Sequence, residues 1–291
     1  MQTILTLKEK KVIIAPDQPF VIIGERINPT RRKKLAETMS VGDFSVVQED
    51  ARRQVEAGAH VLDVNAGIPG GDEPALLCGA AKAVMEVAHI PLCLDTADPE
   101  ALEAVLSIYP GKALINSTTA EASMMERVFP LAKKYGAAVI GVITDEAGVP
   151  PTPEDRLRVA EKLVKRAGDY GVPAEDIVID CLALTVGADH KAGQVTLDSM
   201  AVVRKELGVN LSLGASNVSF GLPDRKIINV AYLALAVACG LTAAITDPTV
   251  AEIQTTLLAC DLLMGRDEYA MRWIQSYRKR AKAAAEALKA N

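Results

Sequence analysis

Histidine is scarce in this chain of 291 residues, and its cysteines follow no metal-binding or disulfide pattern. The three histidines are dispersed, with His60 and His89 near the starts of expected strands and His190 alone, so we expect no bound metal. The five cysteines are odd in number and form no Cys-x-x-Cys pair, which is typical of a reducing, cytoplasmic compartment. We expect them to be packing residues.

A basic excess and a long hydrophobic run are also missing. The formal net charge is −5, whereas a nucleic-acid-binding protein more often presents a basic face. Apolar stretches such as VAYLALAVACGL are too short to span a bilayer, and the first residues lack the pattern of a signal peptide. The sequence is 49% hydrophobic and 24% charged, as in ordinary soluble proteins. We therefore expect neither a nucleic-acid nor a membrane partner.

Short apolar runs recur along the chain and alternate with stretches of helical periodicity. Runs that are apolar on both faces are typical of parallel strands covered by helices. The runs are 21–27, 60–67, 91–97, 113–119, 137–144, 176–183, 210–217 and 242–249. Eight strand–helix units over about 270 residues predict an α/β protein of the (β/α)8 TIM-barrel type. A doubly wound open sheet is the alternative, but GERINPT after the first run is not a Gly-rich phosphate loop.

Two terminal segments lie outside the eight units. Residues 1–20 alternate apolar and polar residues around a charged centre, which predicts a β-hairpin extension that caps the bottom of the barrel. The barrel is expected over residues 21–265, followed by a C-terminal helix over 266–291. Within the barrel, Asp98 and Thr152 each precede a proline and are predicted to cap helices.

Carboxylates and amides gather where the expected strands end. Because barrel active sites lie at the carboxyl ends of the strands, we expect these side chains to converge on one polar pocket. They are Glu25, Arg26, Asn28, Asp63, Asn65, Asp95, Asn116, Asp145, Glu146, Asp180, Asn217 and Asp247.

Some members of this ring have a structural alternative. Glu25 and Arg26 can form an ion pair at the barrel mouth. Asp63 with Asn65 can cap the helix that follows their strand, and Asp247 can cap the helix after Pro248.

Hydrogen-bond acceptors and amides dominate the ring, with Arg26 as its main cation. The lysine that a Schiff-base aldolase requires is missing from the strand ends. Asp95 and Asp180 can serve as the two carboxylates of a glycosidase, but the surrounding amides then have no role. A heterocycle with an N–C–N edge of hydrogen-bond donors fits carboxylates and amides better.

Six motifs in matching order resemble the pterin-binding barrel of methyltetrahydrofolate-dependent methyltransferases. They are GERINPT, LDVNAG, CLDTADPEALEAVL, INSTTAE, VIDCLAL and LGASNVSFGLPDR. Over residues 20 to 265 the chain is similar to the methyltetrahydrofolate:corrinoid protein methyltransferase family. That family includes the enzyme of the acetyl-CoA pathway, the folate module of cobalamin-dependent methionine synthase and the second methyltransferase of corrinoid O-demethylases.

The resemblance implies roles for individual residues. Asp95, Asn116 and Asp180 would hold the N–C–N edge and neighbouring atoms of the pterin. Asn217 would be the catalytic residue and hydrogen-bond near N5. The other implied pterin-site residues are Gly214 and Ser216, which let the backbone approach the ring, and Arg225, which lies near the ligand.

The resemblance also implies the reaction. A methyl group would pass between N5 of tetrahydrofolate and the cobalt of a separate corrinoid protein by direct displacement, with 5-methyltetrahydrofolate as the methylated form. The implied setting is the tetrahydrofolate-methylating half of a corrinoid-dependent O-demethylation system, and the enzyme would be a homodimer.

Two alternatives stay open, and two features depart from the family pattern. One alternative is dihydropteroate synthase, although the last strand ends in ITDPT without the arginine that would hold phosphate; the other is a non-catalytic folate-binding protein. Phe220 stands where the acetyl-CoA pathway enzyme has a polar residue, and residues 1–20 precede the first barrel strand. Both departures bear on the corrinoid partner rather than on the pterin.

Overall fold

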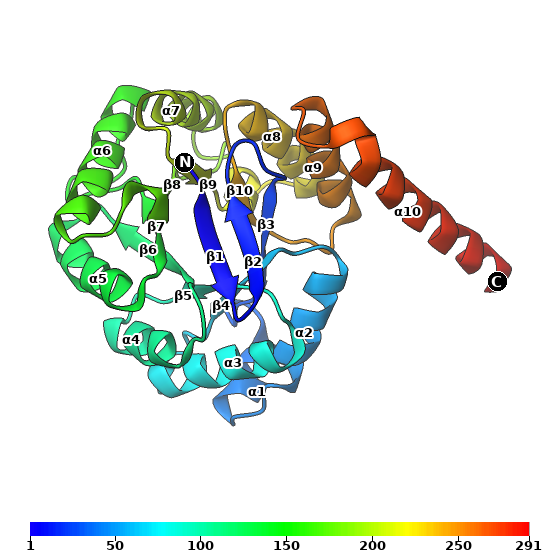
Figure 1. Cartoon of the computed structure of the whole chain (residues 1–291), viewed down its shortest axis with the longest axis horizontal. Helices are drawn as coiled ribbons and strands as arrows, with labels where there is room; N and C mark the ends of the chain where they lie inside the picture. The colour runs from blue at the N-terminus through cyan, green and yellow to red at the C-terminus, as the bar shows by residue number, and fades with distance from the viewer. Residues whose placement is uncertain (291) are drawn as a thin grey trace.

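A closed ring of parallel strands forms the centre of the protein. The computed structural model describes residues 1–290, and its main sheet has the order β10-β3-β4-β5-β6-β7-β8-β9 (Figure 1). The strands are β3 (Val21–Ile27), β4 (Val61–Asn65), β5 (Leu92–Asp95), β6 (Leu114–Thr119), β7 (Ala138–Val142), β8 (Ile177–Asp180), β9 (Asn210–Ser212) and β10 (Ala243–Thr246). The ring closes where Ile245 N donates to Leu213 O over 2.9 Å. The predicted TIM barrel is confirmed.

Helices cover the outside of this ring (Figure 1). They are α1 (Lys33–Ser40), α2 (Ser45–Glu56), α3 (Glu73–Val87), α4 (Pro99–Ile108), α5 (Ala122–Tyr135), α6 (Pro153–Asp169), α7 (Ala192–Leu207), α8 (Arg225–Ala238), α9 (Ala251–Leu263) and α10 (Met271–Ala290). Two predicted caps are confirmed, because Asp98 accepts a hydrogen bond from Glu100 N at the start of α4 and Thr152 accepts one from Asp155 N at the start of α6.

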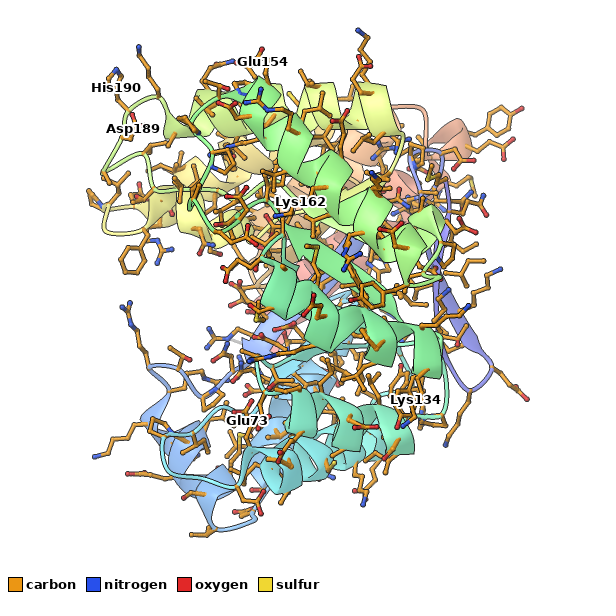
Figure 2. All side chains as sticks on the ribbon, turned by 90° about the vertical axis from the view of Figure 1, so that its left-hand side faces the viewer. Glu73, Lys134, Glu154, Lys162, Asp189 and His190 are labelled. Carbon is orange, nitrogen blue, oxygen red and sulfur yellow. The ribbon has the colours of Figure 1, made fainter. Side chains whose placement is uncertain are left out.

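The first residues form the predicted hairpin, and it closes the bottom of the barrel. β1 (Thr3–Leu7) pairs antiparallel with β2 (Lys10–Ile14). The inward face of the hairpin packs Leu5 of β1 and Val12 and Ile14 of β2 against apolar residues of the barrel interior. Asn210, at the start of β9, donates from Nδ2 to Ile14 O over 2.7 Å. Figures 1 and 2 show the hairpin lying across one end of the barrel, so the opposite end is left as the mouth.

The C-terminal helix extends away from the barrel. Figure 1 shows α10 projecting beyond the ring of helices, with one end next to α9. Along residues 1–290, no helix combines the length and the apolar character needed to cross a membrane.

Candidate active site

A polar cavity of about 540 Å³ lies at the carboxyl ends of the strands. It is lined by Glu25, Arg26, Asn28, Thr30, Arg31, Arg32, Asp63, Asp95, Asn116, Gly214, Asn217 and Ile245. These residues come from β3, β4, β5, β6 and β10 and from the loops that follow β3 and β9. Most of the predicted strand-end ring therefore meets at one place, as barrel geometry requires.

The floor of the cavity consists of two carboxylate–amide pairs on three adjacent strands. Strand register places Asn65 beside Asp95 and Asp95 beside Asn116. Asn116 Nδ2 donates to Asp63 Oδ1 over 3.0 Å, and Asn65 Nδ2 donates to Asp95 Oδ2 over 3.0 Å. The alternative in which Asp63 and Asn65 cap a helix is wrong, because Asp72 caps α3.

Both carboxyl groups of the floor have raised pKa values. Burial raises the pKa of Asp95 to about 6, against the hydrogen bond from Asn65, which lowers it. Burial and the neighbouring Asp95 raise the pKa of Asp63 well above its usual range. A ligand that brings N–H donors to these oxygens would favour their ionised form, so the floor is suited to a donor-rich edge.

Asp180 lies at the end of β8 and does not line the cavity itself. Its carboxylate accepts a hydrogen bond from Leu182 N over 2.7 Å. Leu182 has a φ of 51°, a left-handed backbone that is uncommon for a leucine. Burial raises the pKa of Asp180 to about 6. Its predicted contact with the pterin stays a prediction.

Gly214 and Asn217 belong to the turn that follows β9. A Cβ atom at position 214 would lie 2.9 Å from Asn217 Nδ2, so a larger residue would push this amide from its position. Both residues line the cavity. Across the described part of the chain, no hydrogen bond involves the Asn217 side chain, and the amide is free to bond a ligand.

Ser216 and Arg225 brace this turn from outside the cavity. Arg225 Nη2 donates to Ser216 O over 2.6 Å, and its Nε donates to Ser219 Oγ over 3.0 Å. Ser216 Oγ in turn donates to Glu25 Oε1 over 3.2 Å. The predicted ligand contacts of Ser216 and Arg225 stay predictions, since neither residue lines the cavity.

Glu25 and Arg26 do not form the expected pair with each other. Arg26 Nε lies 3.6 Å from Asp247 Oδ2, and Glu25 is bonded by Ser216 instead. Burial raises the pKa of Glu25 to about 7, with the Asp247 carboxylate adding to the rise. Asp247 accepts from Thr249 N rather than capping α9, whose cap position is Val250. Glu25 therefore lines the cavity, as the strand-end ring predicted, and the alternative of an ion pair with Arg26 is wrong.

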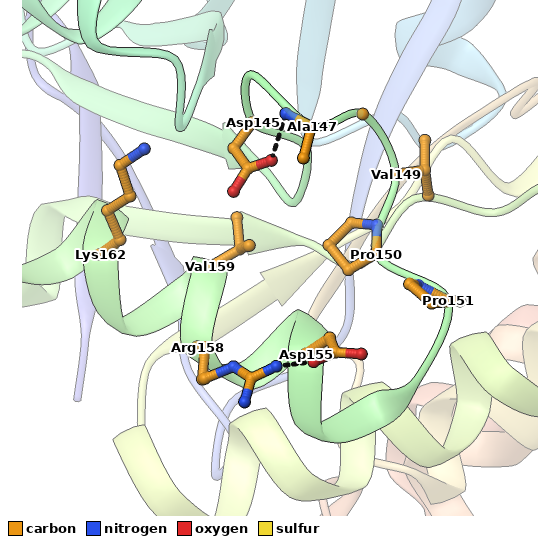
Figure 3. Close-up of a pocket in the computed structure, with 10 residues that line it drawn as sticks. Asp145, Ala147, Val149, Pro150, Pro151, Asp155, Arg158, Val159 and Lys162 are labelled. Carbon is orange, nitrogen blue, oxygen red and sulfur yellow. Dashed lines mark hydrogen bonds and ion pairs between the residues drawn. The ribbon is translucent and has the colours of Figure 1, made fainter.

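Asp145 and Glu146 are outside the site, contrary to expectation. Asp145 Oδ1 accepts from Ala147 N over 2.9 Å and lines a separate hollow of about 400 Å³ beside α6 (Figure 3). Glu146 accepts hydrogen bonds from Ala122 N and from Lys162 Nζ. Both carboxylates follow β7, which ends at Val142, and their bonds within the loop, to the start of α5 and to the middle of α6 hold them away from the cavity.

Two arginines of the mouth were missed by the sequence analysis. Arg31 and Arg32 line the cavity from the loop after β3. Arg32 Nη1 is bound to Asp50 Oδ2 at 2.6 Å. The signal was present as the run TRRKK directly after the first strand, because βα loops form the mouth of a barrel.

The histidines lie where the sequence placed them. His60 Nδ1 accepts from Ile22 N over 3.0 Å near the starts of β3 and β4, and burial lowers its pKa to about 4. Figure 2 shows Asp189 and His190 on a loop at the end of the barrel away from the hairpin. Within residues 1–290, no group of three or more metal-binding side chains comes together.

Comparison with known proteins gives one matching family and several relatives. The family described as pterin binding enzyme matches residues 24–247. The methylcorrinoid:tetrahydrofolate methyltransferase of Eubacterium limosum is 29% identical over 266 residues, which cover 89% of this chain and 97% of that protein. Methionine synthase of Mycobacterium leprae is 32% identical over 238 residues, which cover 77% of this chain. The match covers 20% of that methionine synthase. The similarity inferred from the six motifs is confirmed.

Solved structures with the same fold are more distant in sequence. A Yersinia pestis DHPS with a bound pterine-sulfa conjugate superimposes with a TM-score of 0.68 and 15% identity, over 90% of this chain and 99% of that one. The dihydropteroate synthase of Thermus thermophilus gives a TM-score of 0.64 and 19% identity, over 89% and 99% of the two chains. At these identities the likeness shows the fold alone.

Proposed function

This chain belongs to the pterin binding enzyme family and is a methyltransferase, and from that premise we propose that it transfers a methyl group between N5 of tetrahydrofolate and the cobalt of a separate corrinoid protein. The observation that carries the proposal is the cavity itself. Paired carboxylates and amides form its floor, and the unbonded amide of Asn217 lines the same space. A pterin offers an N–C–N edge to such a floor and a reactive nitrogen away from it.

The floor supplies binding in this proposal. Asp95 and Asn116 face the pterin edge, and Asp180 takes part from the end of β8. Ionised carboxylates accept hydrogen bonds from N–H donors more strongly than neutral acceptors do. This interaction is the same before and after methyl transfer, so it fixes the ring without distinguishing the transition state.

Asn217 supplies the interaction that changes during the reaction. When tetrahydrofolate is methylated, the N5 lone pair forms the new N–C bond and the cobalt–carbon bond breaks. Its electron pair stays on cobalt, which goes from Co(III) to Co(I), and N5 gives up its proton. The Asn217 amide accepts a hydrogen bond from the departing N5 proton, or donates one to N5 in the reverse direction.

A proton acceptor is needed because an asparagine amide does not take up a proton in water. Glu25 lies in the same cavity, and burial brings the pKa of Glu25 to about 7. A group with a pKa near the working pH is suited to exchange a proton with water or substrate. We assign Glu25 this role, with Ser216 Oγ holding its carboxylate in place.

The physiological direction in this proposal is methylation of tetrahydrofolate. The Eubacterium limosum relative, whose name makes methylcorrinoid the donor, supports this choice. The methyl group would come from an O-demethylation reaction on a separate corrinoid protein. The five cysteines are free, which supports the cytoplasm as the compartment.

A homodimer is part of the same proposal. The segment between α9 and α10 exposes Leu263, Met264, Tyr269 and Met271, with 84%, 48%, 85% and 53% of each residue accessible. Apolar surface of this kind is favourable to bury against a second copy. Sedimentation of the wild type and of Leu263→Lys tests it, and a monomeric wild type would rule the dimer out.

One assay separates the proposed reaction from its alternatives. Purified protein is mixed with tetrahydrofolate and a methylated corrinoid protein, and formation of Co(I) and 5-methyltetrahydrofolate is followed. A parallel reaction contains a pterin pyrophosphate and aminobenzoate, the substrates of a dihydropteroate synthase. Methyl transfer alone supports the proposal. Condensation alone would identify a synthase, and folate binding without either reaction would identify a binding protein.

A further inference from the structure

Phe220 forms an exposed aromatic platform at the rim of the cavity. It is 48% accessible and follows the turn that carries Asn217. Its backbone N donates to Asn217 O over 3.1 Å, and its carbonyl accepts from Thr185 Oγ1 over 2.7 Å. Both backbone polar groups of Phe220 are therefore hydrogen-bonded, and the exposed phenyl ring is held in position to contact a ligand.

Two guanidinium groups lie against this ring. Arg31 is 5.1 Å and Arg225 is 5.8 Å from the ring centroid, both within cation–π range. Arg225 is committed to the turn through Ser216 and Ser219. Arg31 comes from the loop after β3, which is separated from β9 only by β10 in the ring, so the contact joins two loops of the mouth.

Arg31 connects the platform to the cavity, because it also lines the cavity. Arg26 is paired with Asp247 and Arg32 with Asp50. For Arg31, the ion pairs found within residues 1–290 include no carboxylate partner. A guanidinium that stacks on an aromatic face keeps its N–H edge free for an anion. The rim therefore places the Phe220 ring, which can contact an aromatic group, next to the Arg31 guanidinium, which can bind an anion.

The cavity thus has two chemically different ends. Its floor is made of carboxylates and amides, and its rim carries Phe220 and Arg31. A ligand that matches both ends has a donor-rich heterocycle, then an aromatic group, then a carboxylate. Tetrahydrofolate has this order, with an aminobenzoyl group and a glutamate after the pterin.

We propose that Phe220 and Arg31 form a subsite for the aminobenzoyl-glutamate tail of the substrate. The Phe220 ring packs against the aryl group, and the Arg31 guanidinium pairs with a glutamate carboxylate. This inference rests on the proposed function and adds a substrate preference: folates with a chain of glutamates bind more tightly than the monoglutamate. The family departure at position 220 then concerns the substrate tail rather than the corrinoid partner.

The test compares a substrate with a tail and one without. Dissociation constants are measured by calorimetry for tetrahydrofolate, its triglutamate and 6-methyltetrahydropterin, with the wild type, Phe220→Ser and Arg31→Gln. Each variant should lose about fivefold in affinity for tetrahydrofolate and keep its affinity for the tail-less pterin. Arg31→Lys should retain part of the triglutamate preference, because it keeps the charge. Tyr277→Ser and Arg278→Gln, both on α10, are the matched controls.

Other outcomes would overturn the proposal in distinguishable ways. Equal losses for the tailed and tail-less ligands would show that the two residues act on the pterin pocket. Unchanged affinities with slower methyl transfer from the corrinoid protein would assign the rim to protein docking. If the wild type bound none of the three pterins, the proposed function would fail and this inference with it.

Discussion

The two ends of the barrel are built from the same strands but use polar groups in opposite ways. At the bottom, Asn210 donates to the hairpin and Lys112 pairs with Asp176 at 2.5 Å. These contacts surround an apolar plug, in which Leu5, Val12 and Ile14 of the hairpin pack against the barrel interior. At the mouth, Asp63 and Asp95 are desolvated with raised pKa values, and the Asn217 amide has no bonded partner among the described residues. The polar groups at the bottom hold the hairpin to the barrel, whereas those at the mouth line a cavity and keep acceptor oxygens and the Asn217 amide available to a ligand.

The largest effect should come from damaging the bottom. Leu5 is fully buried in the plug, so Leu5→Ala removes apolar contacts and leaves a void. We expect the free energy of unfolding to fall by about 2–5 kcal/mol while the folded variant keeps its affinity for tetrahydrofolate. Denaturant titration and calorimetry measure the two quantities. Ile4→Ala, which removes a half-buried neighbour on the same strand, should cost less. Loss of affinity without loss of stability would contradict the division between the two ends.

Asn217→Ala should lower the rate of methyl transfer and leave the stability of the fold almost unchanged. Removing one donor that acts in the transition state costs about 2.7–4 kcal/mol, a loss of roughly 10²–10³-fold in rate. Folate affinity should change far less, because the floor of the site is intact, and stability should stay within about 0.5 kcal/mol. Single-turnover methyl transfer with saturating corrinoid protein gives the rate. Equal losses in rate and affinity would make Asn217 a binding residue only.

The sequence predicted the barrel because its signals are local and repeated. Each strand lies within an expected apolar run, and the hairpin alternates apolar and polar residues as its buried face requires. The position of Asn217 followed from the same logic, since a strand end in a barrel is a place at the mouth.

The hydrogen-bond and ion-pair partners of the site residues were less predictable, because they come from segments that are distant in the sequence. Glu25 and Arg26 both line the cavity, but each bonds a residue of another segment rather than its neighbour. Their actual partners, Ser216 and Asp247, lie about 190 and 220 positions away in sequence, and closure of the barrel brings them near. The expectation for Asp145 was wrong because its carboxylate bonds Ala147 N within its own loop and lines the hollow beside α6.

Asp95→Ala should have an intermediate effect at the mouth. A buried donor left without its charged acceptor costs about 1.5–3 kcal/mol, so tetrahydrofolate affinity should fall roughly 10–150-fold. Asp145→Ala is the matched control, because that aspartate also follows a barrel strand, β7, but lines a different hollow. Calorimetry with both variants decides the matter. Unchanged affinity in Asp95→Ala, or an equal loss in the control, would place the pterin elsewhere.

The smallest effect is a pH dependence with opposite signs for binding and for folding. The pKa of Asp95 is raised to about 6 by burial, and the ligand requires the ionised form. Affinity of the wild type should therefore fall about tenfold between pH 7 and pH 5. Asp95→Asn cannot ionise and should bind weakly with a smaller pH dependence.

Folding stability should move the other way because of the same carboxyl group. In the unfolded chain its pKa is about 3.9, so between about pH 4 and pH 6 the folded protein binds more protons than the unfolded one. The empty wild type therefore loses stability over this range as pH rises. Asp95→Asn does not bear that cost, so its stability relative to the wild type should increase from pH 4 to pH 6 and then level off. Denaturant titrations of both proteins at each pH give this difference, from which the groups that do not interact with Asp95 cancel; Asp63 does not cancel, because Asp95 helps to raise its pKa. A difference that stays constant with pH would show that Asp95 ionises freely.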